Sequence, residues 1–217
     1  MEKRFHRVVA IDGPAASGKS SVARELARRL DFAYVNSGAI YRAVTWDILQ
    51  KRIDPGDGDR IVQTVESARI SCSLQNGESR ILIDDVDPAE HLRDDRVNEN
   101  VSRVSSVPRV REIVVQKMRE YATQHDVVTE GRDIGSVVFP NTPYKFYVDA
   151  SPQVRLQRRA AQGGRDEIAI RDHADSSRPV SPLVIAKDAH VIDTSHLTID
   201  GVVNQIISRL TQMGLRA

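Results

Sequence analysis

Short apolar runs alternate with helical patterns along the N-terminal quarter of the chain. An apolar run at residues 8–11 is followed by a segment, 22–30, whose apolar side chains recur on one helical face. A second short run at 32–35 precedes another helical pattern at 40–49. Consecutive strands separated by helices pair in parallel, because each parallel connection must cross over the sheet. The pattern therefore predicts an α/β fold with a parallel sheet.

The pattern changes after the turn-forming stretch 54–58. Apolar and polar residues alternate at 70–74 and again at 81–83, and Asn76-Gly77 lies between the two runs. Asn-Gly between two alternating runs is typical of a β-hairpin turn. We predict an antiparallel hairpin in an inserted lobe at about residues 54–105. Such a lobe can close over a substrate, and the alternative is an excursion without function.

The second half of the chain returns to strands and helices in alternation. The predicted elements are a helix at 108–121, strands at 127–129 and 145–148, a helix from residue 152, a strand at 191–192 and a helix at 202–210. With the two N-terminal strands they form a five-stranded parallel sheet flanked by helices, in a core of residues 1–53 and 106–217. The strongly polar stretch at about 160–182, which contains Gly163-Gly164, is predicted to form a short lid.

A phosphate-binding loop follows the first predicted strand. Its sequence, GPAASGKS, fits the spacing GxxxxGK[ST], with a strand before it and a helix after it. In such a loop backbone N–H groups surround a polyphosphate, Lys19 reaches the outer phosphates, and the hydroxyl of Ser20 ligates Mg²⁺. We predict that the chain binds ATP through Gly13, Pro14, Ala15, Ala16, Ser17, Gly18, Lys19, Ser20 and Ser21. The alternative is a glycine-rich turn that binds nothing.

Arginines gather where an α/β fold exposes side chains to a ligand. They follow the second and third predicted strands and surround the predicted lid. They are Arg42, Arg132, Arg155, Arg158, Arg159, Arg171 and Arg178. Any one of them could be a solvated ion-pair partner. Together they indicate a site for several phosphates, because phosphoryl transfer mainly requires that anions are positioned and their charge is neutralised.

Several other classes of protein are disfavoured by motifs that the sequence lacks. The NKxD and DxxG patterns of GTP-dependent switch proteins are missing, and no Ser-His-Asp arrangement or clear catalytic base is recognisable. The six histidines have no metal-ligand spacing. An acceptor that is already a phosphate monoester is anionic near neutral pH and needs no base. The sequence therefore favours a phosphate acceptor.

The overall charge is nearly balanced. Lys and Arg number 31 against 30 Asp and Glu, which gives a formal net charge of +1 and no long-range field for nucleic acid or a membrane. Cys72 is the single cysteine, so an internal disulfide is excluded. The charged N-terminus precedes an apolar run too short for a signal peptide or a membrane span. We expect a cytoplasmic monomer whose partners are nucleotides, with no nucleic acid and no membrane.

Five motifs resemble those of bacterial cytidylate kinases, in the same order along nearly the whole chain. They are Ile11-Asp12-Gly13-Pro14, Ser37-Gly38-Ala39-Ile40-Tyr41-Arg42, Pro108-Arg109-Val110-Arg111-Glu112, Glu130-Gly131-Arg132-Asp133-Ile134-Gly135 with Val137-Val138-Phe139-Pro140, and Arg171-Asp172 with Asp175 and Arg178. The resemblance implies a P-loop nucleoside monophosphate kinase that transfers the γ-phosphoryl group of ATP to CMP or dCMP with Mg²⁺, giving CDP or dCDP and ADP. The hairpin insert fits the monophosphate-binding lobe of that family.

The resemblance also implies roles for individual residues. It assigns Ser102, Arg111 and Asp133 to cytosine, Arg42, Arg132 and Arg171 with Ser37 to the acceptor phosphate, and Asp175 and Arg178 to the sugar and lid closure. Lys19, Arg132 and Arg171 are the expected catalytic residues, and Arg155, Arg158, Arg159 and Arg165 the expected lid arginines. The carboxylate of Asp133 can accept from the 4-amino group of cytosine, while Arg111 donates to the ring carbonyl and N3. Uracil would face Asp133 with a carbonyl, which is repulsive.

The sequence departs from the family pattern at a few positions. Asn36 stands where the family usually carries an aspartate, so a second carboxylate near the metal is in doubt. Glu130 follows the strand 127–129 and is then expected to orient Mg²⁺ through water. Ser136 replaces a commoner threonine, and the lid is shorter than in the longest bacterial members.

Two alternative functions remain open from the sequence. One is a kinase for another small metabolite, such as shikimate or dephospho-coenzyme A, although a hydroxyl acceptor would need a carboxylate to activate it. The other is a regulatory module that binds ATP without transferring phosphate. Formation of CDP would exclude the second.

Overall fold

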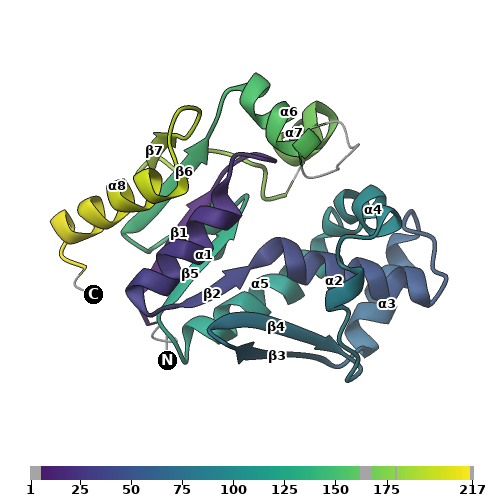
Figure 1. Cartoon of the computed structure of the whole chain (residues 1–217). Helices are drawn as coiled ribbons and strands as arrows, with labels where there is room; N and C mark the ends of the chain where they lie inside the picture. Colours follow the sequence, from purple (N-terminus) through teal and green to yellow (C-terminus); the bar gives the residue numbers. More distant parts are fainter. Residues whose placement is uncertain (1–5, 162–167, 179, 216–217) are drawn as a thin grey trace.

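The structure, a computed structural model, describes residues 6–161, 168–178 and 180–215, with only the backbone of Arg171 (Figure 1). The elements are, in order, β1 (Val8–Asp12), α1 (Lys19–Leu30), β2 (Ala33–Asn36), α2 (Ser37–Gln50), α3 (Gly58–Ser67), β3 (Ile70–Gln75), β4 (Glu78–Ile83), η1 (Ala89–His91), α4 (Asp95–Ser105), α5 (Pro108–Ala122), β5 (Val127–Gly131), η2 (Ile134–Val138), β6 (Tyr144–Asp149), α6 (Pro152–Ala161), α7 (Ile168–Ser176), β7 (His190–Asp193) and α8 (Ile199–Gln212).

A single sheet organises the described residues, with strand order β3-β4-β2-β5-β1-β6-β7. The strands β2, β5, β1, β6 and β7 pair in parallel, as predicted. The hairpin of β3 and β4 is antiparallel, also as predicted. The count of five strands was wrong for the whole sheet, which has seven, because β4 pairs with β2 at Tyr34 and Glu78 and adds the hairpin to the same sheet.

The central strands are covered on both faces. All five residues of β1 are buried, and they alternate between two hydrophobic clusters, since successive side chains of a strand point to opposite faces. Val9 and Ile11 pack with α1 and α8. Val8 and Ala10 pack on the other face, in a cluster to which α2 and α5 contribute. Burial on both faces explains why β1 begins with an uninterrupted apolar run at residues 8–11.

The segment predicted to be an inserted lobe contributes α3, the hairpin and α4. Its side chains Ile61, Ile81 and Val104 belong to the same hydrophobic cluster as Val8 of the central strand. The boundaries at residues 54 and 105 stay a prediction. The predicted lid at about 160–182 corresponds to α7 and the adjacent chain, and part of it, residues 162–167 and 179, lies outside the described residues.

The transition from β2 to α2 takes place without a loop. Asn36 ends the strand and is also the N-cap of α2, because its side-chain oxygen accepts a hydrogen bond from the backbone N–H of Ala39 at 3.0 Å. This cap brings Ser37 and the first turn of α2 directly to the carboxyl end of β2.

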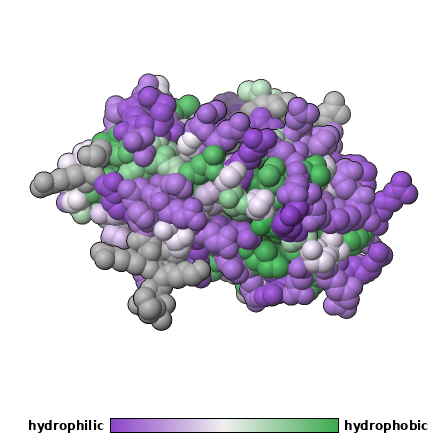
Figure 2. Space-filling model, turned by 90° about the horizontal axis from the view of Figure 1, so that it is seen from below, coloured by the Kyte–Doolittle hydropathy of each residue, from purple (hydrophilic) through white to green (hydrophobic). Residues whose placement is uncertain are grey.

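The face of the molecule seen from below is mainly polar. Figure 2 views the molecule from below and shows hydrophilic side chains interrupted by smaller hydrophobic areas. Within residues 6–161, 168–178 and 180–215, the helices are too short or too polar for any of them to cross a membrane. Cys72 is a free thiol on β3, half-buried.

Candidate active site

The predicted site residues lie around one edge of the sheet, where the parallel strands β1, β2, β5 and β6 end. Ligands of open parallel α/β sheets bind beyond the carboxyl ends of the strands. The phosphate loop follows β1, the start of α2 follows β2, and Arg132 and Asp133 follow β5. The helix α6 follows β6 and carries three of the predicted lid arginines, Arg155, Arg158 and Arg159.

The phosphate loop has a tightly constrained backbone. A Cβ atom on Gly13 would lie 2.1 Å from the carbonyl oxygen of Val148, so the loop can approach β6 only without a side chain there. Gly18, with φ 91°, precedes α1 in the left-handed region that glycine adopts at little cost. Ala16 adopts a positive φ of 58° as well. The loop is thus shaped by residues that keep its backbone close to β6 and turn it toward α1.

The N-terminus of α1 is arranged to receive an anion. Within the described part of the chain, no side chain caps this helix at Gly18, so its first N–H groups remain oriented toward the loop. Lys19 is buried, and its ammonium group donates to the carbonyl oxygen of Pro14 at 3.0 Å. The helix dipole, the amide groups and the lysine therefore all favour a negative charge at the N-terminus of α1. A polyphosphate bound there would meet these groups together.

Two oxygen ligands suited to Mg²⁺ lie next to the loop. The hydroxyl of Ser20 donates to Oε1 of Glu130 at 2.7 Å, and Glu130 is buried at the end of β5. The same Oε1 accepts from the hydroxyl of Tyr34 at 3.2 Å, which in turn accepts from the side-chain amide of Asn36 at 3.1 Å. Among the described residues no group of three or more His, Cys, Asp or Glu side chains could hold a metal. This set fits Mg²⁺, which keeps several waters and uses few protein ligands beside substrate phosphates.

Two of the three residues assigned to cytosine, Arg111 and Asp133, are in contact in the structure. Arg111 of α5 donates through Nη2 to Oδ2 of Asp133 at 2.5 Å, and its Nη1 donates to the carbonyl oxygen of Ser105 at 3.2 Å. Arg111 and Asp133 are both buried. The guanidinium carbon of Arg111 lies 5.3 Å from the ring centroid of Tyr41. Ser102 is half-buried on α4, one turn before Ser105.

Several buried polar atoms around this pair have no hydrogen-bond partner among the described residues. They are the hydroxyl of Tyr41, Nε of Arg111 and Nη2 of Arg178. Burial raises the pKa of Tyr41, and burial lowers the pKa of Arg178, which also faces Arg111 and Asp133. Buried polar groups are normally paired, so such a cluster of unpaired ones marks a place for a polar ligand.

Helix α7, which belongs to the predicted lid, reaches the end of β5 through a carboxylate. Asp175 of α7 accepts from Nε of Arg132 at 2.8 Å, and its other oxygen lies 3.6 Å from Nη2 of Arg178. These three assigned residues therefore lie together. Ser37 is close by, since a Cβ on Gly131 would come within 2.5 Å of its hydroxyl. Arg42, on the next turn of α2, donates to the carbonyl oxygen of Gly38 at 3.2 Å.

Two lid arginines hold the phosphate loop from the other side. Arg155 pairs with Asp172 of α7, whose Oδ1 accepts from the backbone N–H of Ala15 at 3.0 Å. Arg158 donates to the carbonyl oxygen of Ser17 at 3.1 Å and to the hydroxyl of Thr194 at 2.9 Å. In the structure these arginines contact loop backbone.

The remaining predicted site residues are Ser21, Arg159, Arg165 and Arg171. Arg159 is half-buried on α6. Arg171 belongs to α7 by its backbone, and Arg165 lies outside the described residues. Ser21 is exposed and lines a shallow surface pocket with Arg24 and Asp200.

Three residues of this region were not singled out as site residues from the sequence. Thr194 is buried and donates to the carbonyl oxygen of Ser17 at 2.9 Å, but it follows a four-residue strand that gives only a weak signal. Asp172 and Asp12 stand inside the family motifs, yet their partners lie far away in the sequence. Only the fold reveals what they contact.

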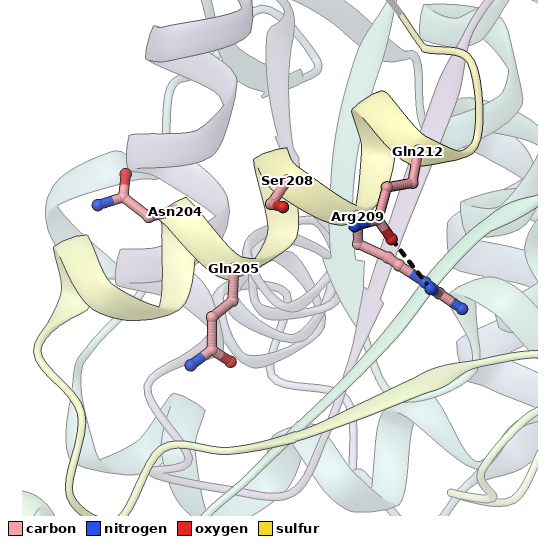
Figure 3. A pocket seen from close by; sticks show the side chains of 5 residues that line it. All are labelled: Asn204, Gln205, Ser208, Arg209 and Gln212. Atoms are coloured by element: carbon pink, nitrogen blue, oxygen red, sulfur yellow. Dashed lines mark hydrogen bonds between the residues drawn. The ribbon is translucent and has the colours of Figure 1, made fainter.

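A second pocket lies away from the strand ends, on α8. Asn204, Gln205, Ser208, Arg209 and Gln212 line it, and Figure 3 shows that all five come from this one helix. Arg209 donates to Gln212 at 3.1 Å and contacts His190 of β7 at 3.0 Å. The pocket has neither a carboxylate nor a helix N-terminus, so it offers nothing for phosphoryl transfer.

Comparison with known proteins gives a match along almost the whole chain. Residues 9–212 match a family model described as cytidylate kinase. The cytidylate kinase of Desulforamulus reducens is 42% identical over 214 residues, which cover 94% of this chain and 96% of that protein. The cytidylate kinase of Rhodococcus opacus is 42% identical over 212 residues, covering 92% and 93%. A gluconokinase from Sinorhizobium meliloti 1021 covers 97% of this chain and 94% of its own, with a TM-score of 0.50 and 12% identity, which is a likeness of fold.

Proposed function

The chain belongs to the cytidylate kinase family, and on that premise we propose how its residues carry out the reaction. It is an ATP-dependent phosphotransferase that converts CMP or dCMP to CDP or dCDP, with ADP as the second product. The alternatives of another small-metabolite kinase and of a non-catalytic ATP-binding module have no support in the comparisons.

The donor nucleotide is proposed to bind with its phosphates at the loop between β1 and α1. The residues involved are Gly13 to Ser21, with the N–H groups at the start of α1 oriented toward the anion. Lys19 lies at the same place. It neutralises charge on the outer phosphates while the γ-phosphoryl group is transferred from ATP to the acceptor. Arg155 and Arg158 support the loop through its backbone carbonyl groups at Ala15 and Ser17.

Mg²⁺ is proposed to bind beside Ser20 and Glu130. A bound Mg²⁺ would neutralise the negative charge that develops on the phosphates during transfer. The hydroxyl of Ser20 would be the direct protein ligand of the ion, and the carboxylate of Glu130 would orient water around it. Tyr34 and Asn36 form a neutral hydrogen-bonded chain that holds Glu130, at the position where the family usually has a second carboxylate.

The acceptor is proposed to lie across the ends of β2 and β5. Its phosphate is held by Ser37, Arg42, Arg132 and Arg171, and its sugar by Asp175 and Arg178. Because the acceptor phosphate is already anionic, one of its oxygens attacks the γ-phosphorus without a base, while the bond to the β-phosphate oxygen breaks. Lys19, Arg132 and Arg171 are the catalytic residues in this proposal.

The observation that carries the choice of substrate is the buried pair of Arg111 and Asp133. It lies among polar atoms of Tyr41, Arg111 and Arg178 that have no hydrogen-bond partner among the described residues, with Ser102 on the neighbouring helix. Asp133 accepts from the 4-amino group of cytosine, and Arg111 donates to the ring carbonyl and N3. A uracil carbonyl facing Asp133 leaves a buried polar mismatch of about 1 to 3 kcal/mol.

A coupled assay of ADP release with CMP, dCMP, UMP and AMP tests this proposal. We expect CMP and dCMP to be phosphorylated far better than UMP and AMP. Asp133→Ala should weaken CMP binding far more than ATP binding in calorimetry. Equal turnover of UMP and CMP, or a loss confined to ATP, would contradict the assignment of cytosine to Asp133.

The proposal further includes a cytoplasmic monomer that binds neither nucleic acid nor a membrane.

A further inference from the structure

Asp12 is a buried carboxylate to which the proposed reaction gives no role. It is the last residue of β1 and is 5% exposed. Its Oδ1 accepts from the backbone N–H of Ile134 at 2.7 Å, and its Oδ2 accepts from that of Gly135 at 2.8 Å. Both carboxylate oxygens thus hold the backbone of a segment more than a hundred residues further along the chain.

The segment that Asp12 holds begins at the base-recognising residue. Ile134 and Gly135 are the first residues of η2, a single π-helical turn, and Asp133 directly precedes them. The carbonyl oxygen of Asp133 accepts from Val137 at 2.9 Å and Val138 at 3.1 Å. Asp133 is therefore fixed in two ways: Arg111 holds its carboxylate, and Asp12 holds the turn that its backbone starts.

Asp12 is itself one of the most firmly placed residues of the sheet. In β1 it lies opposite Gly131 of β5 and Tyr147 of β6, so strands flank it on both sides. The next residue, Gly13, begins the phosphate loop and packs against the backbone of β6. One residue thus fixes the turn that carries Asp133 and is bonded covalently to the start of the loop that binds the donor.

The carboxylate is retained here at a cost. Burial raises the pKa of Asp12 to about 6, against the effect of the two N–H groups that hydrogen-bond to it. Asp133 also disfavours the charge, and Arg132 favours it. A charged acceptor forms stronger hydrogen bonds to two amides than a neutral one, so it defines the position of the turn more sharply.

We propose that Asp12 is a positioning residue for the acceptor base, which sets Asp133 at a fixed place relative to the phosphate loop. This inference rests on the proposed role of Asp133 in cytosine recognition. Asp12 acts through Asp133 and touches neither nucleotide. Its loss should therefore affect recognition of CMP while the binding of ATP is retained.

The variant Asp12→Asn tests this inference in the full-length protein. Its amide group presents an N–H to one of the two backbone donors, so the turn loses one acceptor at almost unchanged volume. We expect the KM for CMP to rise roughly tenfold and the preference for CMP over UMP to fall, with less than a twofold change in the KM for ATP. Asp12→Ser, which leaves room for a water molecule, carries the same expectations should Asp12→Asn fail to fold.

Asp47→Asn is a matched control. Asp47 is also a buried carboxylate, but it pairs with Lys51 of the same region at 2.9 Å and lies outside the proposed site. We expect this variant to keep both KM values. A parallel rise of the KM for ATP and CMP in Asp12→Asn, or no rise at all, would overturn the inference.

A double-mutant cycle separates this inference from the proposed function. If Asp12 acts through Asp133, adding Asp12→Asn to Asp133→Asn should not raise the KM for CMP further. Additive effects would show that Asp12 acts by another route and would sink the inference alone. If Asp133→Asn leaves the preference for CMP over UMP unchanged, the role of Asp133 in the proposed function fails first, and the inference falls with it.

Discussion

Lys19 is the residue that we propose neutralises charge on the donor side of the site. Its ammonium group is buried beside the loop, where its attraction for phosphate is stronger than it would be in water. We expect Lys19→Ala to lower kcat at least about a hundredfold, because it removes charge neutralisation in the transition state. The measurement is a coupled ADP-release assay, together with circular dichroism to show that the variant is folded. A normal rate in the folded variant would contradict the role given to the loop.

Tyr34 and Asn36 form a hydrogen-bonded chain that ends at the carboxylate of Glu130. Removing the hydroxyl of Tyr34 leaves Glu130 with Ser20 as its remaining partner in this hydrogen-bonded chain. We expect Tyr34→Phe to raise the half-saturating Mg²⁺ concentration about threefold, the effect of one modest hydrogen bond, with the KM for CMP unchanged. Binding of Mn²⁺ in the presence of ATP, followed by electron paramagnetic resonance, gives a readout that does not depend on turnover.

Tyr121→Phe is the control for the tyrosine hydroxyl. The hydroxyl of Tyr121 donates to the carbonyl oxygens of Ser73 and Arg80 in the hairpin, far from Glu130 in the hydrogen-bond network. Tyr121→Phe should lower the free energy of unfolding without changing the half-saturating Mg²⁺ concentration. Equal Mg²⁺ requirements in Tyr34→Phe and the unaltered protein would show that Ser20 alone holds Glu130 in place.

At the scale of elements, the packing of the phosphate loop against β6 decides whether the loop can form. A methyl group on Gly13 would lie 2.1 Å from the carbonyl oxygen of Val148, which is a backbone atom and cannot turn away. We expect Gly13→Ala to lower the free energy of unfolding by about 2 to 4 kcal/mol and to weaken ATP binding. Urea denaturation measures the first effect and calorimetry the second.

Gly58→Ala is the matched control for that substitution. Gly58 is the first residue of α3, and a Cβ there would meet nothing within 4 Å. Alanine is a better helix former than glycine, so this variant should be stabilised by up to about 1 kcal/mol. If both variants unfolded at the same urea concentration, the close approach of the loop to β6 would have no energetic consequence.

The sequence predicts the elements that depend on local pattern. The five parallel strands follow from short apolar runs that alternate with helical patterns, and the hairpin follows from Asn76-Gly77 between two alternating segments. The addition of the hairpin to the main sheet is not visible in the sequence, because it rests on the single pairing of Tyr34 with Glu78. A contact of this kind depends on how α2 and α3 bring the chain back, which no local periodicity encodes.

The site can be predicted where it follows a motif. The loop from Gly13 to Ser20 and the pair of Arg111 and Asp133 belong to motifs of the family. The structure brings Arg111 and Asp133 into contact. The hydrogen bonds of Asp12 to residues 134 and 135, and that of Thr194 to Ser17, join positions more than a hundred residues apart. They arise from strand order, so they become apparent only when the sheet is assembled.

At the scale of the whole molecule, the strand order explains why donor and acceptor sites are adjacent. β1, which leads into the phosphate loop, lies between β5 and β6. The proposed acceptor residues Ser37, Arg42 and Arg132 follow β2 and β5, and the helices α6 and α7 follow β6, so the described residues that we propose to contact phosphate lie at one edge of the sheet. Asp175 and Asp172 then connect α7 to Arg132 and to the phosphate loop, respectively. Lid, loop and acceptor site are thus joined by charged contacts across the strand ends.

The stability of the whole molecule should depend on pH through carboxylates whose pKa values are shifted in opposite directions by folding. Hydrogen bonds from Arg28 and Arg29 lower the pKa of Glu25 to about 2, and a hydrogen bond from Lys145 lowers that of Asp188. Such groups contribute stability above their unfolded pKa values, and this contribution is lost as pH falls through their folded ones. Asp12 has the opposite sign, since its folded pKa of about 6 is above its unfolded value of 3.8.

The folded protein therefore binds more protons at Asp12 than the unfolded chain does between about pH 6 and pH 4, and this group stabilises the fold as pH falls through that window. We expect the unfolding free energy of the unaltered protein to increase relative to that of Asp12→Asn by about 2.5 kcal/mol between pH 7.5 and pH 4, because Asn does not titrate. Urea denaturation of both proteins at each pH measures the difference, in which the contributions of Glu25 and Asp188 cancel. A difference that stays constant over this range would mean that Asp12 titrates as it does in the unfolded chain, and that its burial at the end of β1 costs the fold nothing.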